Sequence, residues 1–173
     1  MNERKILKIG ICCLVILCLV LSGIILVQKS EERRDQKLYM EYIYSELNEV
    51  EWFTENMIKD DTTKEQKEEQ LVYLSYQLRN IAEELEDGYH FVSEEIPSVV
   101  STWFYEKSSD ILNSEFVTAQ GEFFDEGLSF LRSVHSKIKS LIEPMRGQDQ
   151  LNLDKELSID DFSTMLLEFY RNQ

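Results

Sequence analysis

The chain has 173 residues, of which 18 are Lys or Arg and 33 are Asp or Glu, so its formal net charge is −15. This acidic balance excludes a general nucleic-acid-binding surface, which requires an excess of positive charge. Six Gly and two Pro are too few for the many tight turns of a β-sandwich or barrel. The length and the 11% aromatic content favour one globular domain over a disordered acidic tail.

An uncharged apolar run covers residues 9–27, after a short basic tail at residues 1–8. As a helix, these 19 residues extend about 28 Å, close to the thickness of the hydrocarbon core of a bilayer. We therefore predict a single-pass transmembrane anchor at residues 9–27, in contact with membrane lipid. Cleavage as a signal peptide after Ser22 and Gly23 is the alternative, but the apolar run continues beyond that pair.

Basic residues flank the run on both sides, so the two possible orientations in the membrane differ little in flanking positive charge. Arg4, Lys5 and Lys8 directly abut the run, which favours a cytoplasmic N-terminus and an extracytoplasmic body. A scaffold whose body faces the cytoplasm is the alternative. The three cysteines all lie within the run, so residues 28–173 cannot form a disulfide in either compartment.

The remaining domain, residues 28–173, holds 15 Lys and Arg against 32 Asp and Glu, a net charge of −17. A first helix continues from the apolar run to Lys59, with apolar residues at helical spacing around a polar Thr54. A polar turn follows, in which Thr62 and Thr63 each fit a capping box. The second helix then repeats apolar residues at spacings of 3 and 4, a seam of coiled-coil type formed by Leu71, Leu74, Leu78, Ile81 and Leu85. Two such helices are expected to pack as an antiparallel hairpin.

Three further helices follow a break that we place at Gly88. The third starts between Ser93 and Pro97, and its apolar face is formed by Val99, Val100, Trp103, Phe104 and Ile111. The fourth runs from about Thr118 to Glu143, stops at Pro144, and carries a stripe of Phe124, Leu128, Leu131, His135, Ile138 and Ile142. A last short helix is capped by Ser158 and carries Ile159, Phe162, Leu166 and Phe169. The predicted fold is all-α: a transmembrane helix, then an up-down antiparallel bundle of four helices, plus a short C-terminal helix.

Adjacent aromatic residues recur along the chain, and neighbours on a helix cannot share one face because they differ by about 100°. Some of these rings must therefore leave the main seam. We take Trp52, Trp103, Tyr105 and Phe123 as candidate partner-binding residues, because exposed aromatic rings anchor protein partners. The alternative is a wide core in which each helix contacts two neighbours.

His135 lies where the fourth seam calls for an apolar residue, which makes it a candidate ligand-binding or pH-sensing group. The alternative is that Val134 takes the buried position and His135 lies at the edge of the seam.

No phosphate-binding loop, zinc-binding pattern or nucleophile elbow occurs in the sequence, so we predict no enzyme, no cofactor and no metal site. The function expected is a non-enzymatic, membrane-anchored interaction module of bacterial type, which binds or regulates another membrane or envelope protein. A small-molecule sensor, with its ligand held between helices near His135, is the second possibility.

Overall fold

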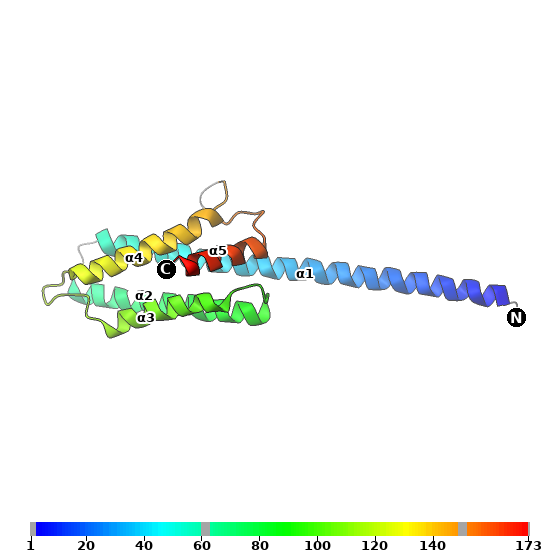
Figure 1. Cartoon of the computed structure of the whole chain (residues 1–173), viewed down its shortest axis with the longest axis horizontal. Helices are drawn as coiled ribbons and strands as arrows, with labels where there is room; N and C mark the ends of the chain where they lie inside the picture. The colour runs from blue at the N-terminus through cyan, green and yellow to red at the C-terminus, as the bar shows by residue number, and fades with distance from the viewer. Residues whose placement is uncertain (1–2, 60–62, 149–151, 173) are drawn as a thin grey trace. The chain divides into compact units, whose positions relative to one another are not determined.

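The computed structural model describes residues 3–59, 63–148 and 152–172, and every regular element within these ranges is helical. Two isolated bridges, Val117 with Phe123 and Arg146 with Leu153, join short stretches of extended backbone. The elements in chain order are α1 (Glu3–Lys59), α2 (Lys64–Phe91), η1 (Ser98–Val100), α3 (Ser101–Asn113), α4 (Asp125–Ile142), η2 (Glu143–Met145) and α5 (Ile159–Arg171). The all-α prediction is confirmed (Figure 1).

The chain divides into two units, Met1–Gln36 and Lys37–Gln173. The first consists of the N-terminal part of α1. The second contains the rest of α1 and all other elements, and it has its own hydrophobic core. This division lies between residues 36 and 37, and the predicted division into anchor and domain lies between residues 27 and 28.

The described part of the chain contains no helix long and apolar enough to cross a membrane. The side chains of residues 1–13 and 15, which include part of the expected span at residues 9–27, lie outside the described residues. The backbone of residues 3–27 is helical, as expected.

The predicted antiparallel hairpin is formed by α1 and α2, with a register centred on the turn. Glu49 and Tyr73 each lie twelve residues from residue 61 and are hydrogen-bonded. Tyr42 and Asn80 each lie nineteen residues from it and are also hydrogen-bonded. The cap of α2 is Thr63, which exchanges hydrogen bonds with Gln66 in a capping box, so the later of the two expected registers is the one formed.

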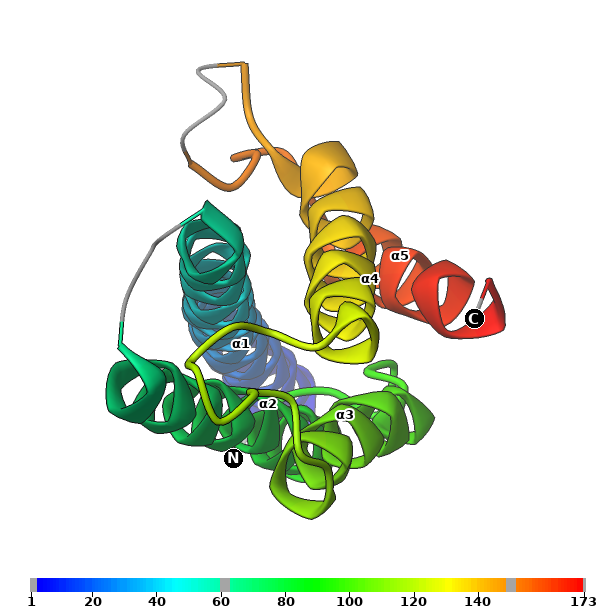
Figure 2. The same cartoon turned by 90° about the vertical axis from the view of Figure 1, so that its left-hand side faces the viewer.

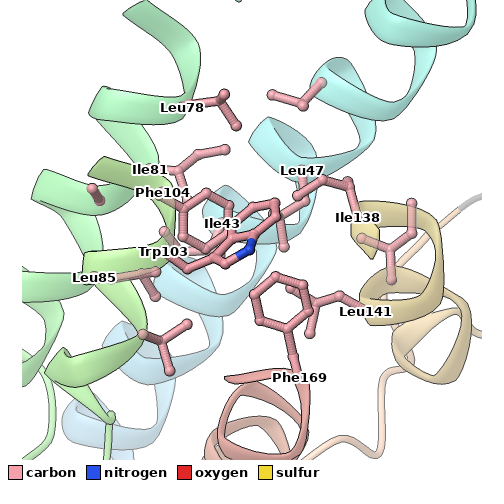
Figure 3. Close-up of a cluster of buried hydrophobic side chains, with 14 of the residues drawn as sticks. Ile43, Leu47, Leu78, Ile81, Leu85, Trp103, Phe104, Ile138, Leu141 and Phe169 are labelled. Atoms are coloured by element: carbon pink, nitrogen blue, oxygen red, sulfur yellow. The ribbon is translucent and has the colours of Figure 1, made fainter. Parts of the chain in front are cut away.

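In the second unit, the other helices lie around the core-facing side of the C-terminal part of α1. The α2–α3 pair covers one side of α1, and α4 and α5 cover another (Figure 2). Side chains from all five helices converge in the core (Figure 3), where ten labelled residues meet: Ile43, Leu47, Leu78, Ile81, Leu85, Trp103, Phe104, Ile138, Leu141 and Phe169. The seam predicted on α2 is entirely buried. On α5, Phe162, Leu166 and Phe169 are buried, and Ile159 is half-buried.

The start of the fourth helix was predicted wrongly. It begins at Asp125, and residues 117–124 instead form a tight turn closed by hydrogen bonds from Gly121 N to Thr118 O and from Phe124 N to Phe116 O. Gly121 has φ +85°, a conformation that residues with a Cβ rarely adopt. In the sequence, the helical spacing of apolar residues continues back into residues 117–124. In the structure these residues form a turn that Gly121 closes.

An ion pair connects the end of this helical segment to α1. Arg146, directly after η2, places Nη2 2.7 Å from Oε2 of Glu51, and both side chains are largely removed from solvent. Charge pairs of this kind constrain geometry more than they add stability, because desolvation offsets much of the attraction. The contact fixes how the segment after α4 lies against α1.

Gly88 does not end the second helix, contrary to the prediction. α2 continues to Phe91, and Gly88 lies buried within it. The reason is packing: a Cβ at Gly88 would overlap the hydroxyl and Cζ of Tyr39 and lie 2.8 Å from Cε2. Tyr39 cannot move aside easily, because its hydroxyl donates to the Glu84 carbonyl at 3.1 Å and its ring packs edge-on against Phe162. Glycine is therefore required at this crossing of α1 and α2.

We expect Gly88→Ala to destabilise the second unit by about 2 kcal/mol, because overpacking of a filled core exceeds the gain in helix propensity. Urea unfolding of the full chain, followed by circular dichroism, measures the change. Gly147→Ala is the matched control, since a Cβ there would come no closer than 3.4 Å to any neighbour. Equal stability of Gly88→Ala and the control would contradict this account of the crossing.

Candidate functional site

Two of the four candidate partner-binding residues differ sharply in exposure. Trp52 on α1 is 64% exposed, whereas Trp103 on α3 is only 4% exposed. The Trp103 ring lies edge-to-face with Phe104 and Phe169, each at a centroid distance of 4.9 Å. Trp103 is thus a core residue, and its expected place on a surface patch is corrected.

The other two candidates are half-buried. Tyr105 lies on α3, and its hydroxyl donates to Oε2 of Glu86 at 3.4 Å. Phe123 lies in the turn before α4, with the ammonium of Lys67 5.3 Å from its ring centroid. Lys67 also donates to the Gly121 carbonyl at 2.9 Å, so this ring helps to hold the turn. Of the four, only Trp52 presents most of its ring to solvent.

His135 is half-buried on α4, and the adjacent Val134 takes the buried position, as the alternative interpretation had it. Its Nδ1 lies 3.2 Å from the Glu51 carbonyl oxygen and 3.4 Å from Oγ1 of Thr54. A carbonyl oxygen can only accept, so the contact with Glu51 requires the tautomer with hydrogen on Nδ1. The polar ring therefore joins α4 to α1 within the protein.

Trp52 borders an open groove of about 510 Å³ between α1 and α2. The two helices place aromatic, carboxylate and amide side chains along it, including Glu49, Trp52, Phe53, Glu69, Gln70 and Tyr73. Phe53 and Tyr73 meet edge-on, with a centroid distance of 5.0 Å. The groove thus combines a paired aromatic floor with an additional, largely exposed indole ring.

A small polar network fixes one side of this groove. Tyr73 donates to Oε1 of Glu49 at 2.6 Å, and the Gln77 amide donates to the same oxygen at 3.1 Å. Gln77 also donates to the Tyr73 hydroxyl at 2.6 Å. These hydrogen bonds join Glu49 on α1 to Tyr73 on α2 at the groove, with Gln77 beside them.

The sequence interpretation missed Tyr73, Gln77 and Glu49 as site residues, because it followed the apolar seam only. A signal was present: Tyr73 and Gln77 are four residues apart, beside the seam residues Leu74 and Leu78. Counting back from the turn places Glu49 opposite Tyr73, as the hydrogen bond confirms.

Negative charge gathers along the same pair of helices. Partial burial raises the pKa of Glu46, and the nearby carboxylates of Glu49 and Glu84 raise it further, while a hydrogen bond from Asn80 opposes them. Burial likewise raises the pKa of Glu84, helped by Asp87 and Glu83. The hydrogen bond to Glu49 raises the pKa of the Tyr73 hydroxyl. The surface beside the groove therefore carries an excess of negative charge.

We expect Glu46→Gln to stabilise the protein at pH 7 and to lose this advantage as the pH falls toward 4.5. The raised pKa of Glu46 means that the folded state holds this proton more tightly than the unfolded state. Its contribution therefore favours folding at low pH and is lost as pH rises through the folded pKa. Urea unfolding at both pH values measures the difference between the variant and the unmodified chain.

Glu106→Gln, at an exposed position on α3, controls for the general loss of one negative charge. If both variants show the same dependence on pH, Glu46 has no special position in the acidic surface.

Comparison with known proteins finds no family model, no curated protein and no solved structure that matches this chain.

Proposed function

We propose that the chain is a membrane-anchored, non-enzymatic helical module that binds or regulates another membrane or envelope protein. The observation that carries the proposal is the exposure of the N-terminal part of α1. The described side chains at Leu14 and residues 16–27 are all exposed, and the large apolar ones are 48% to 70% accessible. A helix that is apolar on all sides requires apolar surroundings.

The lipid of a membrane would provide these apolar surroundings. The uncharged run at residues 9–27 has the length of a bilayer core. Among the described residues, the hydrophobic core of the protein begins at Tyr39, so the earlier apolar side chains have no place in it. Residues 9–27 accordingly act as a single-pass anchor in this proposal. Arg4, Lys5 and Lys8 favour a cytoplasmic N-terminus, with the helical domain on the extracytoplasmic side.

The second unit suits the binding of a protein. It has a core of its own, and it displays a largely exposed tryptophan beside carboxylates on adjacent helices. Exposed indole rings are among the side chains that contribute most to protein–protein affinity. The domain therefore acts as the binding part, and the anchor holds it at the membrane.

We expect the full chain to stay in the membrane pellet after extraction with alkaline carbonate, and the double variant Leu17→Arg/Leu21→Arg to move to the supernatant. Each Arg near the centre of a span costs about 2.5–3.5 kcal/mol. Leu38→Arg, at an exposed position outside the run, is the matched control and should remain in the pellet. Extraction of the unmodified chain would contradict the anchor.

Cysteine labelling in intact cells tests on which side of the membrane the helical domain lies. Residues 28–173 contain no cysteine, so Ser114→Cys adds a single thiol there, at an exposed position. Labelling by a membrane-impermeant maleimide in intact cells is the expected result. Labelling only after the cells are broken would place the domain in the cytoplasm.

We also expect the protein to leave gently solubilised membranes as a stoichiometric complex with a second protein. Copurification through an affinity tag, followed by size-exclusion chromatography, measures the ratio of the two chains. The span variant Leu17→Arg/Leu21→Arg should lose this partner if the partner is encountered in the membrane. Recovery of the chain alone, as a monodisperse species in several mild detergents, would contradict an interaction module.

A further inference from the structure

The groove between α1 and α2 has a chemistry that selects a particular kind of partner side chain. The charged residues that line it are Glu49 and Glu69, and both are acidic. Its aromatic residues are Trp52, Phe53 and Tyr73. An aromatic face beside carboxylates attracts a cation in two ways, through the ring quadrupole and through opposite charge.

We infer that this groove binds an arginine-bearing segment of the partner protein, with the guanidinium group stacked on the exposed indole of Trp52 and paired with the carboxylates of Glu49 and Glu69. The inference rests on the proposed function, because it assigns the surface and the partner chemistry of that interaction.

Charge complementarity is the first argument for this occupant. The domain from residue 28 onward has a net charge of −17. The pKa of Glu46, one turn of α1 before Glu49, is raised by burial and then by the charge of Glu49. Uncompensated negative charge therefore lies beside the groove, and a cation that binds there relieves this repulsion.

A hydrogen-bond acceptor within the groove wall is the second argument. The Oε1 atom of Gln70 is buried and has no hydrogen-bond partner among the described residues. Glu49 is exposed, and only its Oε1 atom accepts hydrogen bonds from Tyr73 and Gln77, so its Oε2 atom is open to a donor from outside. The buried acceptor on Gln70 is left without a donor, and a donor-rich group that enters the groove can supply one. Arginine supplies five N–H donors in a plane that also stacks on aromatic rings, whereas lysine supplies a compact ammonium with three donors.

The form of the groove favours a segment of a protein over a small cation. The groove is open and extends along two helices, and Trp52 remains 64% exposed. A free arginine would cover little of this ring. Apolar side chains beside the arginine of a peptide would cover the rest of the ring and of the Phe53–Tyr73 pair, which adds the burial that a stable contact needs.

The test uses the full chain in a neutral maltoside detergent and the peptide acetyl-Leu-Arg-Leu-Arg-Leu-amide, with binding measured by isothermal titration calorimetry. We expect Trp52→Ala to weaken binding about tenfold, and Glu49→Gln or Glu69→Gln about threefold to tenfold each. The affinity of the unmodified protein should fall as the salt concentration rises, because charge attraction is screened.

Matched controls separate this site from general attraction to an acidic surface. Tyr76→Ala removes another exposed aromatic ring, 71% accessible on α2 but not among the residues that line the groove, and should change affinity less than twofold. Glu106→Gln removes one exposed charge on α3 and should behave in the same way. A peptide with Gln in place of Arg should not bind, and one with Lys should bind more weakly than the Arg peptide.

Equal affinity across all variants, or no binding of the Arg peptide at millimolar concentration, would overturn the inference. Equal binding of the Lys peptide, or tight binding of arginine methyl ester alone, would also overturn it. This failure is distinguishable from failure of the proposed function. A partner that copurifies equally well with the Trp52→Ala variant leaves the interaction module intact and removes only the groove.

Discussion

Residues 39–57 of α1 are the segment against which α2, α4 and α5 pack, while α3 packs on α2. Their buried side chains contact α2 on one side and α4 and α5 on another (Figures 2 and 3). The one polar residue in this buried series, Thr54, donates its hydroxyl to the Val50 carbonyl at 2.8 Å. It therefore occupies a fully buried place without an unsatisfied donor. A helix buried this broadly needs an apolar surface wider than a coiled-coil seam, which explains the buried tyrosines Tyr39 and Tyr44.

The same helix also borders the groove that it forms with α2. Antiparallel pairing with α2 sets the register, and the hydrogen bond between Tyr73 and Glu49 lies at the groove wall. On another side of α1, the ion pair of Glu51 with Arg146 and the contact of His135 with the Glu51 backbone position α4 and η2. Hydrogen bonds therefore position Glu49 and Tyr73 at the groove, whereas the Trp52 ring remains largely exposed.

The aromatic residues of this domain fall into two groups, those buried in the core and those exposed on the surface. Trp103 meets Phe104 and Phe169 within 5 Å and fills the space where α3 approaches α5. Trp52 lies on the outward side of the central helix, beside carboxylates. Both are followed by phenylalanine in the sequence, so local pattern alone treats them alike. Their neighbours on other helices make one a packing residue and the other a surface residue.

Much of the helical framework was predictable from spacing and caps. The end of α1 at Lys59, the capping box at Thr63, the seam of α2 and the cap at Ser158 all depend on residues within one turn of each other. Local interactions of this kind are encoded by short stretches of chain. The antiparallel register of α1 and α2 was also accessible, by counting outward from the turn.

Contacts between distant residues decided the rest. Gly88 resembles a helix terminator, yet α2 passes through it, because Tyr39 from another helix needs the space of its missing side chain. The helical spacing before Asp125 gave way to a turn closed at Gly121. By itself, the sequence determined an acidic all-α chain with an apolar run at residues 9–27. The tertiary structure decided which aromatic rings stay on the surface and which carboxylates lie beside them, because each side chain's exposure depends on helices far away in the sequence.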